Sequence, residues 1–159
     1  MSFLRSTIGL KILMATTGIV QVGFVIGHML GNLKLYLGPA ELNTYGEHLR
    51  ELGHPILPNM AFLWTARIVL LIALIVHVRC ALILTRRAQA ARPVAYQMTQ
   101  KDESTYASRT MRWGGIFIFA FVVFHILHLT TGDAHPSFQP GKPFENVVSG
   151  FSVVWVALL

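Results

Sequence analysis

The stretch Ile12–Leu33, ILMATTGIVQVGFVIGHMLGNL, decides the fold of this chain. It contains no charged side chain, and as an α-helix it would extend ~33 Å, enough to cross a bilayer hydrocarbon core of about 30 Å. A single imidazole, His28, lies near its end, next to Gly27. Because an ionisable group is costly in lipid, His28 needs a structural or functional partner inside a helix bundle.

The composition and the apolar segments along the whole chain indicate a membrane protein. Of the 159 residues, 53% are hydrophobic and 13% are charged, about half the charged fraction of a soluble domain. Further apolar segments span about 60–84 and 113–130, and a fourth run covers 147–159. The fold expected is a single all-α transmembrane domain, 1–159, with three complete spans. The fourth run is too short to cross a bilayer, so we expect this sequence to be the N-terminal part of a longer protein.

The positive charges predict the topology. Six of the 13 lysines and arginines cluster after the second apolar segment, at Arg86, Arg87, Arg92, Lys101, Arg109 and Arg112. The positive-inside rule puts this loop and the N-terminus in the cytoplasm and the loops 34–59 and 131–146 outside. Leucine and tyrosine residues at helical spacing predict an amphipathic interfacial helix over about 41–52. The net charge of +6 is therefore a topology signal and does not indicate nucleic-acid binding.

Three histidines inside the apolar segments are candidate haem ligands. Counted from the cytoplasmic side, His28 lies ~24 Å deep and His125 ~18 Å deep, so both belong to the outer half, whereas His77 lies near the inner face. The neighbours on the helix face of His28 are Thr17, Gln21, Phe24 and Gly31, which include the polar groups of that helix. Those on the face of His77 are all small, at Ala66, Ala73, Cys80 and Ala81. A b-type haem takes two imidazoles from different helices. The depths favour His28 with His125, and leave His77 for a partner beyond residue 159.

Simpler roles remain open for these and other residues. Membrane histidines also serve as packing residues or in proton paths. His128 is a candidate for quinone contact, packing or ligation, and His135 is expected to face solvent, as are His48 and His54. Arg79 and Arg109 are candidates for contacts to haem propionates or quinone, or for snorkelling anchors. Without a CxxCH motif, covalent haem attachment is not predicted.

Several motifs, in order and over essentially the whole chain, resemble one family. They are Gly18-Ile19-Val20, the run Gly27–Leu33, Ile75-Val76-His77, the run Ala107–Gly115 and Phe124-His125. Together they are similar to the cytochrome b membrane anchor of bacterial succinate:quinone oxidoreductases (succinate dehydrogenase or fumarate reductase), of the single-anchor type with five helices and two haems. The resemblance implies that His28 and His125 hold the distal haem and His77 the proximal one.

The resemblance also implies a function. The chain would anchor a flavoprotein and an iron–sulfur subunit of complex II, a tricarboxylic acid cycle enzyme, to the bacterial cytoplasmic membrane. It would pass electrons through haem b to a quinone, expected to be menaquinone, and carry no catalytic residue for succinate. Two other readings stay open: a b-type cytochrome subunit of another quinone-linked oxidoreductase, and a proton relay or transporter without haem.

Overall fold

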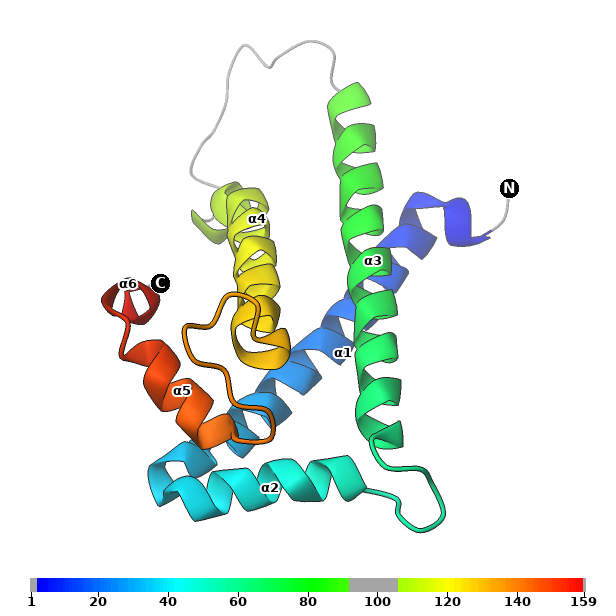
Figure 1. Cartoon of the computed structure of the whole chain (residues 1–159). Coiled ribbons are helices and arrows are strands. Elements are labelled where there is room, and N and C mark those ends of the chain that lie inside the picture. The colour runs from blue at the N-terminus through cyan, green and yellow to red at the C-terminus, as the bar shows by residue number, and fades with distance from the viewer. Residues whose placement is uncertain (1–2, 92–105, 159) are drawn as a thin grey trace.

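The computed structural model describes residues 3–91 and 106–158, and these form helices and connecting loops with no strand among them. The helices are η1 (Phe3–Arg5), α1 (Thr7–Asn32), η2 (Leu33–Leu37), α2 (Pro39–Glu51), α3 (Ala61–Ala90), α4 (Tyr106–Ile126), the π-helical turn η3 (Leu127–Thr131), α5 (Pro143–Phe151) and α6 (Val154–Ala157). Figure 1 shows α1 and α3 crossing, with α4 beside them.

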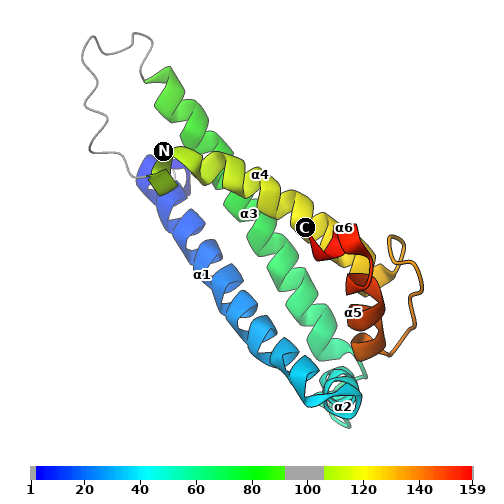
Figure 2. The ribbon, with the colours of Figure 1, turned by 90° about the vertical axis from the view of Figure 1, so that its left-hand side faces the viewer.

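The bundle has two distinct ends. At the end called here the basic end, α1 begins and α3 finishes, and the Arg87 guanidinium donates hydrogen bonds to the Thr7 hydroxyl (3.2 Å) and to the Arg5 carbonyl (2.9 Å). At the opposite end, called here the α2 end, α2 lies across the bundle (Figure 1). Figure 2 shows α5 next to α2 at the same end. Helix α2 covers most of the stretch predicted to be helical, about 41–52.

Three helical segments are long and apolar enough to cross a membrane: Thr7–Leu37, Ala61–Ala90 and Thr110–Thr131. Their large side chains mostly face outward, for example Ile19, Ile72 and Ile118. A soluble domain would bury such residues, whereas lipid solvates them at no cost. These three helices are candidates for the expected spans. Helix α1 packs along α3, while α4 makes no comparable contact with either of them in the described parts of the chain.

Some helix limits differ from those expected. Helix α1 begins at Thr7 rather than near residue 12, because the Ser6 hydroxyl caps it by accepting a hydrogen bond from the Gly9 amide (3.0 Å). Helix α3 continues to Ala90, beyond 84. The apolar run 147–159, expected to be the start of one spanning helix, is instead divided between α5 and α6, because Val153 adopts an extended backbone conformation between them.

Candidate functional site

The structure brings His28 of α1 and His125 of α4 together. Their ring centroids are 5.8 Å apart, and the two ring planes are almost perpendicular, at 89°. Nothing else joins the middles of these two helices so closely: α4 otherwise makes little contact with α1 in the residues described. The two imidazoles therefore form the main link between α1 and α4.

Each of these imidazoles is supported by a phenylalanine one turn earlier on its own helix. Phe24 stacks on His28 with ring centroids 5.2 Å apart, and Phe121 stacks on His125 at 5.6 Å. The spacing i, i+4 puts both members of each pair on one helix face. The aromatic ring limits the rotamers of each histidine, so both imidazoles are held pointing toward the space between the helices.

The separation of the two rings is compatible with one metal ion between them. Imidazole nitrogens that lie ~2 Å from one metal on opposite sides put their ring centroids ~6 Å apart. The measured 5.8 Å is close to this value. The stripe beside His28 also leaves room for a flat group, because a Cβ atom added at Gly23 or Gly27 would meet no atom within 4 Å. The donor set and the space thus fit a bis-histidine haem.

His77 of α3 lies at another level of the bundle. Its Nδ1 atom is 3.0 Å from the Met14 carbonyl oxygen and 3.3 Å from the Thr17 hydroxyl oxygen. Thr17 is eleven residues before His28 on α1, which corresponds to ~16 Å along the helix axis. His77 is therefore far from the His28–His125 pair, in agreement with the depths derived from the sequence.

The hydrogen bonds of His77 indicate which ring nitrogen carries the proton and which one remains available as a ligand. A carbonyl oxygen only accepts, so Nδ1 carries the proton and donates it to Met14. A histidine that ligates a metal commonly donates its second N–H to a carbonyl in this way. Gly18 makes the approach possible, because a Cβ atom there would lie 3.3 Å from Cε1 of His77. The Nε2 atom of His77 is thereby left available for a ligand.

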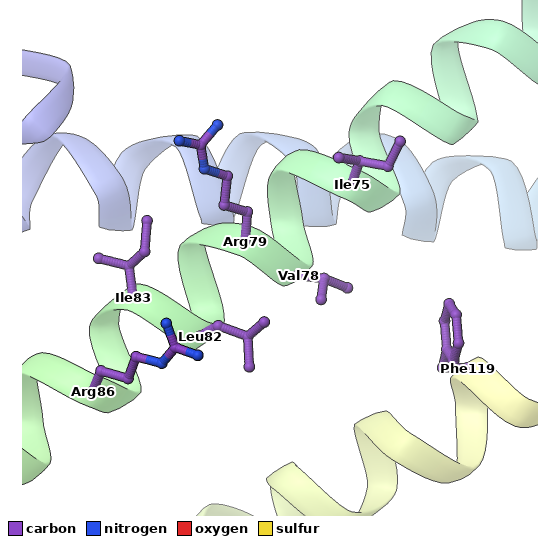
Figure 3. A pocket seen from close by; sticks show the side chains of 7 residues that line it. All are labelled: Ile75, Val78, Arg79, Leu82, Ile83, Arg86 and Phe119. Carbon is purple, nitrogen blue, oxygen red and sulfur yellow. The ribbon is translucent and has the colours of Figure 1, made fainter.

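Of the two arginines predicted to contact haem propionates or quinone, only Arg79 has a side chain among the described residues. Arg79 lies on α3 two residues after His77, about 200° around the helix, so its side chain leaves from nearly the opposite face. It borders a groove between α3 and α4, shown in Figure 3. Arg109 is in the first turn of α4, and its side chain lies outside the described residues. The structure does not bring Arg79 to a predicted histidine.

A second histidine cluster at the α2 end is not evident from the sequence. His128 is only 2% exposed, stacks on Phe124 at 5.1 Å, and its ring centroid is 4.7 Å from that of His135. Among the residues that the structure describes, the Nε2 atom of His128 has no hydrogen-bond partner. The π-helical turn η3 carries His128, and such turns are frequent at functional sites. In the sequence, only the close spacing of His125 and His128 pointed to this histidine cluster.

His135 is more enclosed than expected. It was predicted to face solvent, but it is partly buried. Its Nε2 atom lies 2.8 Å from the Asn146 carbonyl oxygen, and its Nδ1 atom accepts from the Ser137 amide at 3.0 Å. The prediction was wrong because the loop after η3 folds back onto α5, a contact between distant residues. His48 and His54, in contrast, are exposed as predicted.

Comparison of the chain with protein-family models, with curated proteins and with solved structures finds no match. No group of three or more histidine, cysteine or acidic side chains that could hold a metal ion is found within 3–91 and 106–158. A bis-histidine haem needs only two such side chains, because the porphyrin supplies the other ligands.

Proposed function

We propose that this chain is the haem b-bearing membrane anchor of a succinate:quinone oxidoreductase. The observation that carries the proposal is the His28–His125 pair, with imidazole centroids 5.8 Å apart on two different membrane-spanning helices. His77 is proposed as a ligand of a second haem. The motif resemblance supplies the assignment to this particular enzyme.

The chain's own residues would bind and orient the cofactor. His28 and His125 would each offer one imidazole nitrogen, and Phe24 and Phe121 would fix the ring orientations by stacking. Met14 and Thr17 would hold His77 in the tautomer with a free Nε2. When bound, haem b supplies reversible one-electron transfer. Arg79 and Arg109 remain predicted contacts for propionates or quinone.

The remaining partners follow from the proposed assignment. Electrons from succinate would reach this chain through a flavoprotein and an iron–sulfur subunit on the cytoplasmic side, and would leave it on a membrane quinone, menaquinone in our proposal. The proposed location is the bacterial cytoplasmic membrane, with the N-terminus in the cytoplasm. This orientation makes the basic end of the bundle the cytoplasmic end, as the positive-inside rule requires.

A reduced-minus-oxidised spectrum of the protein in membranes tests the proposal. His28→Ala and His125→Ala should each remove the same b-type spectral component, and His77→Ala should remove a different one. His48→Ala, an exposed residue of α2, is the matched control and should change neither. Absence of a b-type α-band, or loss of one identical component in all three variants, would contradict the assignment of ligands.

A co-purification experiment separates the proposed enzyme from the other quinone-linked oxidoreductases. A flavoprotein that oxidises succinate should copurify with the chain in mild detergent. If the copurifying partner oxidises hydrogen or formate, the haem ligands stand and the enzyme assignment falls. A proton relay without haem is separated from both by the absence of the spectral component.

A further inference from the structure

A groove between α3 and α4 near the basic end combines arginine with apolar side chains. Its volume is about 400 Å³. Six of the residues around it belong to α3 and one to α4: Ile75, Val78, Arg79, Leu82, Ile83, Arg86 and Phe119. Figure 3 shows the α3 side chains along one stretch of the helix, with Phe119 on the facing part of α4. We call this feature the α3–α4 groove.

Arg86 lies at the end of the groove nearest the basic end of the bundle, and Arg79 lies further along it. Arg86 is close to the end of α3, and Arg79 is two turns, or ~10 Å, deeper in the span. A charged side chain at that depth is costly without a partner of opposite charge. Neither guanidinium has a hydrogen bond or a carboxylate within reach among the residues described, whereas Arg87 is satisfied by Thr7 and Arg5. Asp102 and Glu103 lie outside those residues.

The apolar part of the groove continues toward the middle of the membrane. Ile75, Leu82 and Phe119 are 57%, 54% and 52% exposed, so the groove is open along its side. From Arg86 to Ile75 the helix rises ~16 Å, close to the ~15 Å depth of one hydrocarbon leaflet. The groove therefore offers positive charge at the level of the headgroups and an apolar wall as long as an acyl chain.

We propose that the α3–α4 groove binds one anionic phospholipid, with the phosphate at Arg86, the charge of Arg79 deeper in the groove, and an acyl chain along Leu82, Val78 and Ile75. Basic pockets between membrane helices on the cytoplasmic side are suited to anionic headgroups. Charge complementarity selects this occupant over a neutral lipid, and the apolar wall selects it over a free anion. The proposal does not depend on haem, since the groove and His77 are on opposite faces of α3.

Native mass spectrometry of the purified full-length protein, with any subunits that it retains, tests this site. Phosphatidylglycerol and phosphatidylcholine with identical acyl chains are compared as ligands. At about a fivefold contribution per arginine, the wild type should prefer the anionic lipid ~30-fold at one site. Arg79→Gln with Arg86→Gln should abolish this preference, and Val78→Trp should prevent binding by filling the groove with both charges retained.

Arg67→Gln is the matched control, because Arg67 belongs to the same helix but lies near its other end against Trp64. It should keep the full preference. Equal binding of the two lipids, or equal loss in the Arg67 variant, would overturn the proposal. Competition by inorganic phosphate would overturn it in favour of a simple anion site. Appearance of the lipid site only after removal of a copurified subunit would show that a protein partner covers the groove instead.

Discussion

Gly31 of α1 and Tyr45 of α2 are in direct contact: a Cβ atom added at Gly31 would lie 2.6 Å from the Tyr45 hydroxyl oxygen. Gly31 is buried at this point. The contact holds the amphipathic helix α2 against the end of α1, one turn beyond His28. The absence of a side chain at position 31 is therefore what lets α2 lie across the bundle.

Gly31→Ala should lower the stability of the protein. The added methyl group would force the Tyr45 ring to move, and overpacking of this kind costs ~1–3 kcal/mol. Thermal unfolding in detergent, followed by circular dichroism, measures the effect. Gly23→Ala is the control, since position 23 on the same helix is open and alanine there should be neutral or stabilising. Equal melting temperatures for the two variants would show that Tyr45 does not pack on Gly31.

Gly18→Val should disturb the environment of His77 and leave the His28–His125 pair intact. A branched side chain would enter the space that the His77 ring occupies, because even a Cβ atom lies 3.3 Å from Cε1. In difference spectra we expect the component assigned to His77 to shrink or shift, with the component assigned to His28 and His125 unchanged. Gly114→Val, at an open position of α4, serves as the control. A change in the second component alone would mean that the two levels are assigned the wrong way round.

His128→Phe should leave the melting temperature unchanged or raise it. The substitution keeps an aromatic ring against Phe124 and removes a buried Nε2 atom that has no hydrogen-bond partner. Burying such an atom costs ~1–3 kcal/mol, which phenylalanine would not incur. The haem spectrum should also be unchanged. Loss of a spectral component would instead identify His128 as a ligand in place of His125.

Gly150→Ala should destabilise the α2 end. A Cβ atom at this position would overlap Cε1 of His128 and lie 3.0 Å from Nε2 of His135. Hydrogen exchange of α5 should therefore become faster, because α5 can no longer pack on η3. Gly114→Ala, on an open face of α4, should leave this exchange unchanged.

Glu145 should make the docking of α5 on α2 sensitive to acid. The hydrogen bond from the Asn43 side-chain amide to its carboxylate lowers the pKa of Glu145 below the usual value of 4.5. Because the folded-state pKa is depressed, the stabilisation is present above pH 4.5 and is lost as the pH falls through the lower, folded-state pKa. Thermal unfolding of the wild type should become easier over that range, and Glu145→Gln should flatten this dependence. Glu41→Gln, in an exposed ion pair with Lys34, is the control.

The sequence predicted the features that depend on a local pattern of residues, namely the long helices and the level of each histidine. Long apolar runs predicted three candidate spanning helices, since a bilayer sets a minimum length for a spanning helix. Counting residues along each run placed His28 and His125 at one level and His77 at another. The direction of His77 toward Met14 could not be predicted, because it depends on the angle at which α3 crosses α1.

The enclosed His135 and the broken final segment were missed for a related reason. The loop 132–142 returns to α5 through hydrogen bonds to Asn146, such as that from the Gln139 amide (2.8 Å). Such contacts join residues whose spacing has no regular period, so no helical or strand pattern reveals them. The same holds for the α3–α4 groove, which needs Phe119 of one helix to face Arg79 and Leu82 of another.

The sequence by itself determined that this protein has helices long and apolar enough to cross a membrane, where along each helix the histidines lie, and which end is basic. Those properties depend on hydrophobicity and on a fixed rise per residue. Only the tertiary structure decided which rings meet, which nitrogen of His77 is free, and that Arg79 borders a groove on the face away from His77. These depend on helix rotation and crossing, which are set by the packing of side chains such as Gly18 and Gly31 against residues distant in the chain.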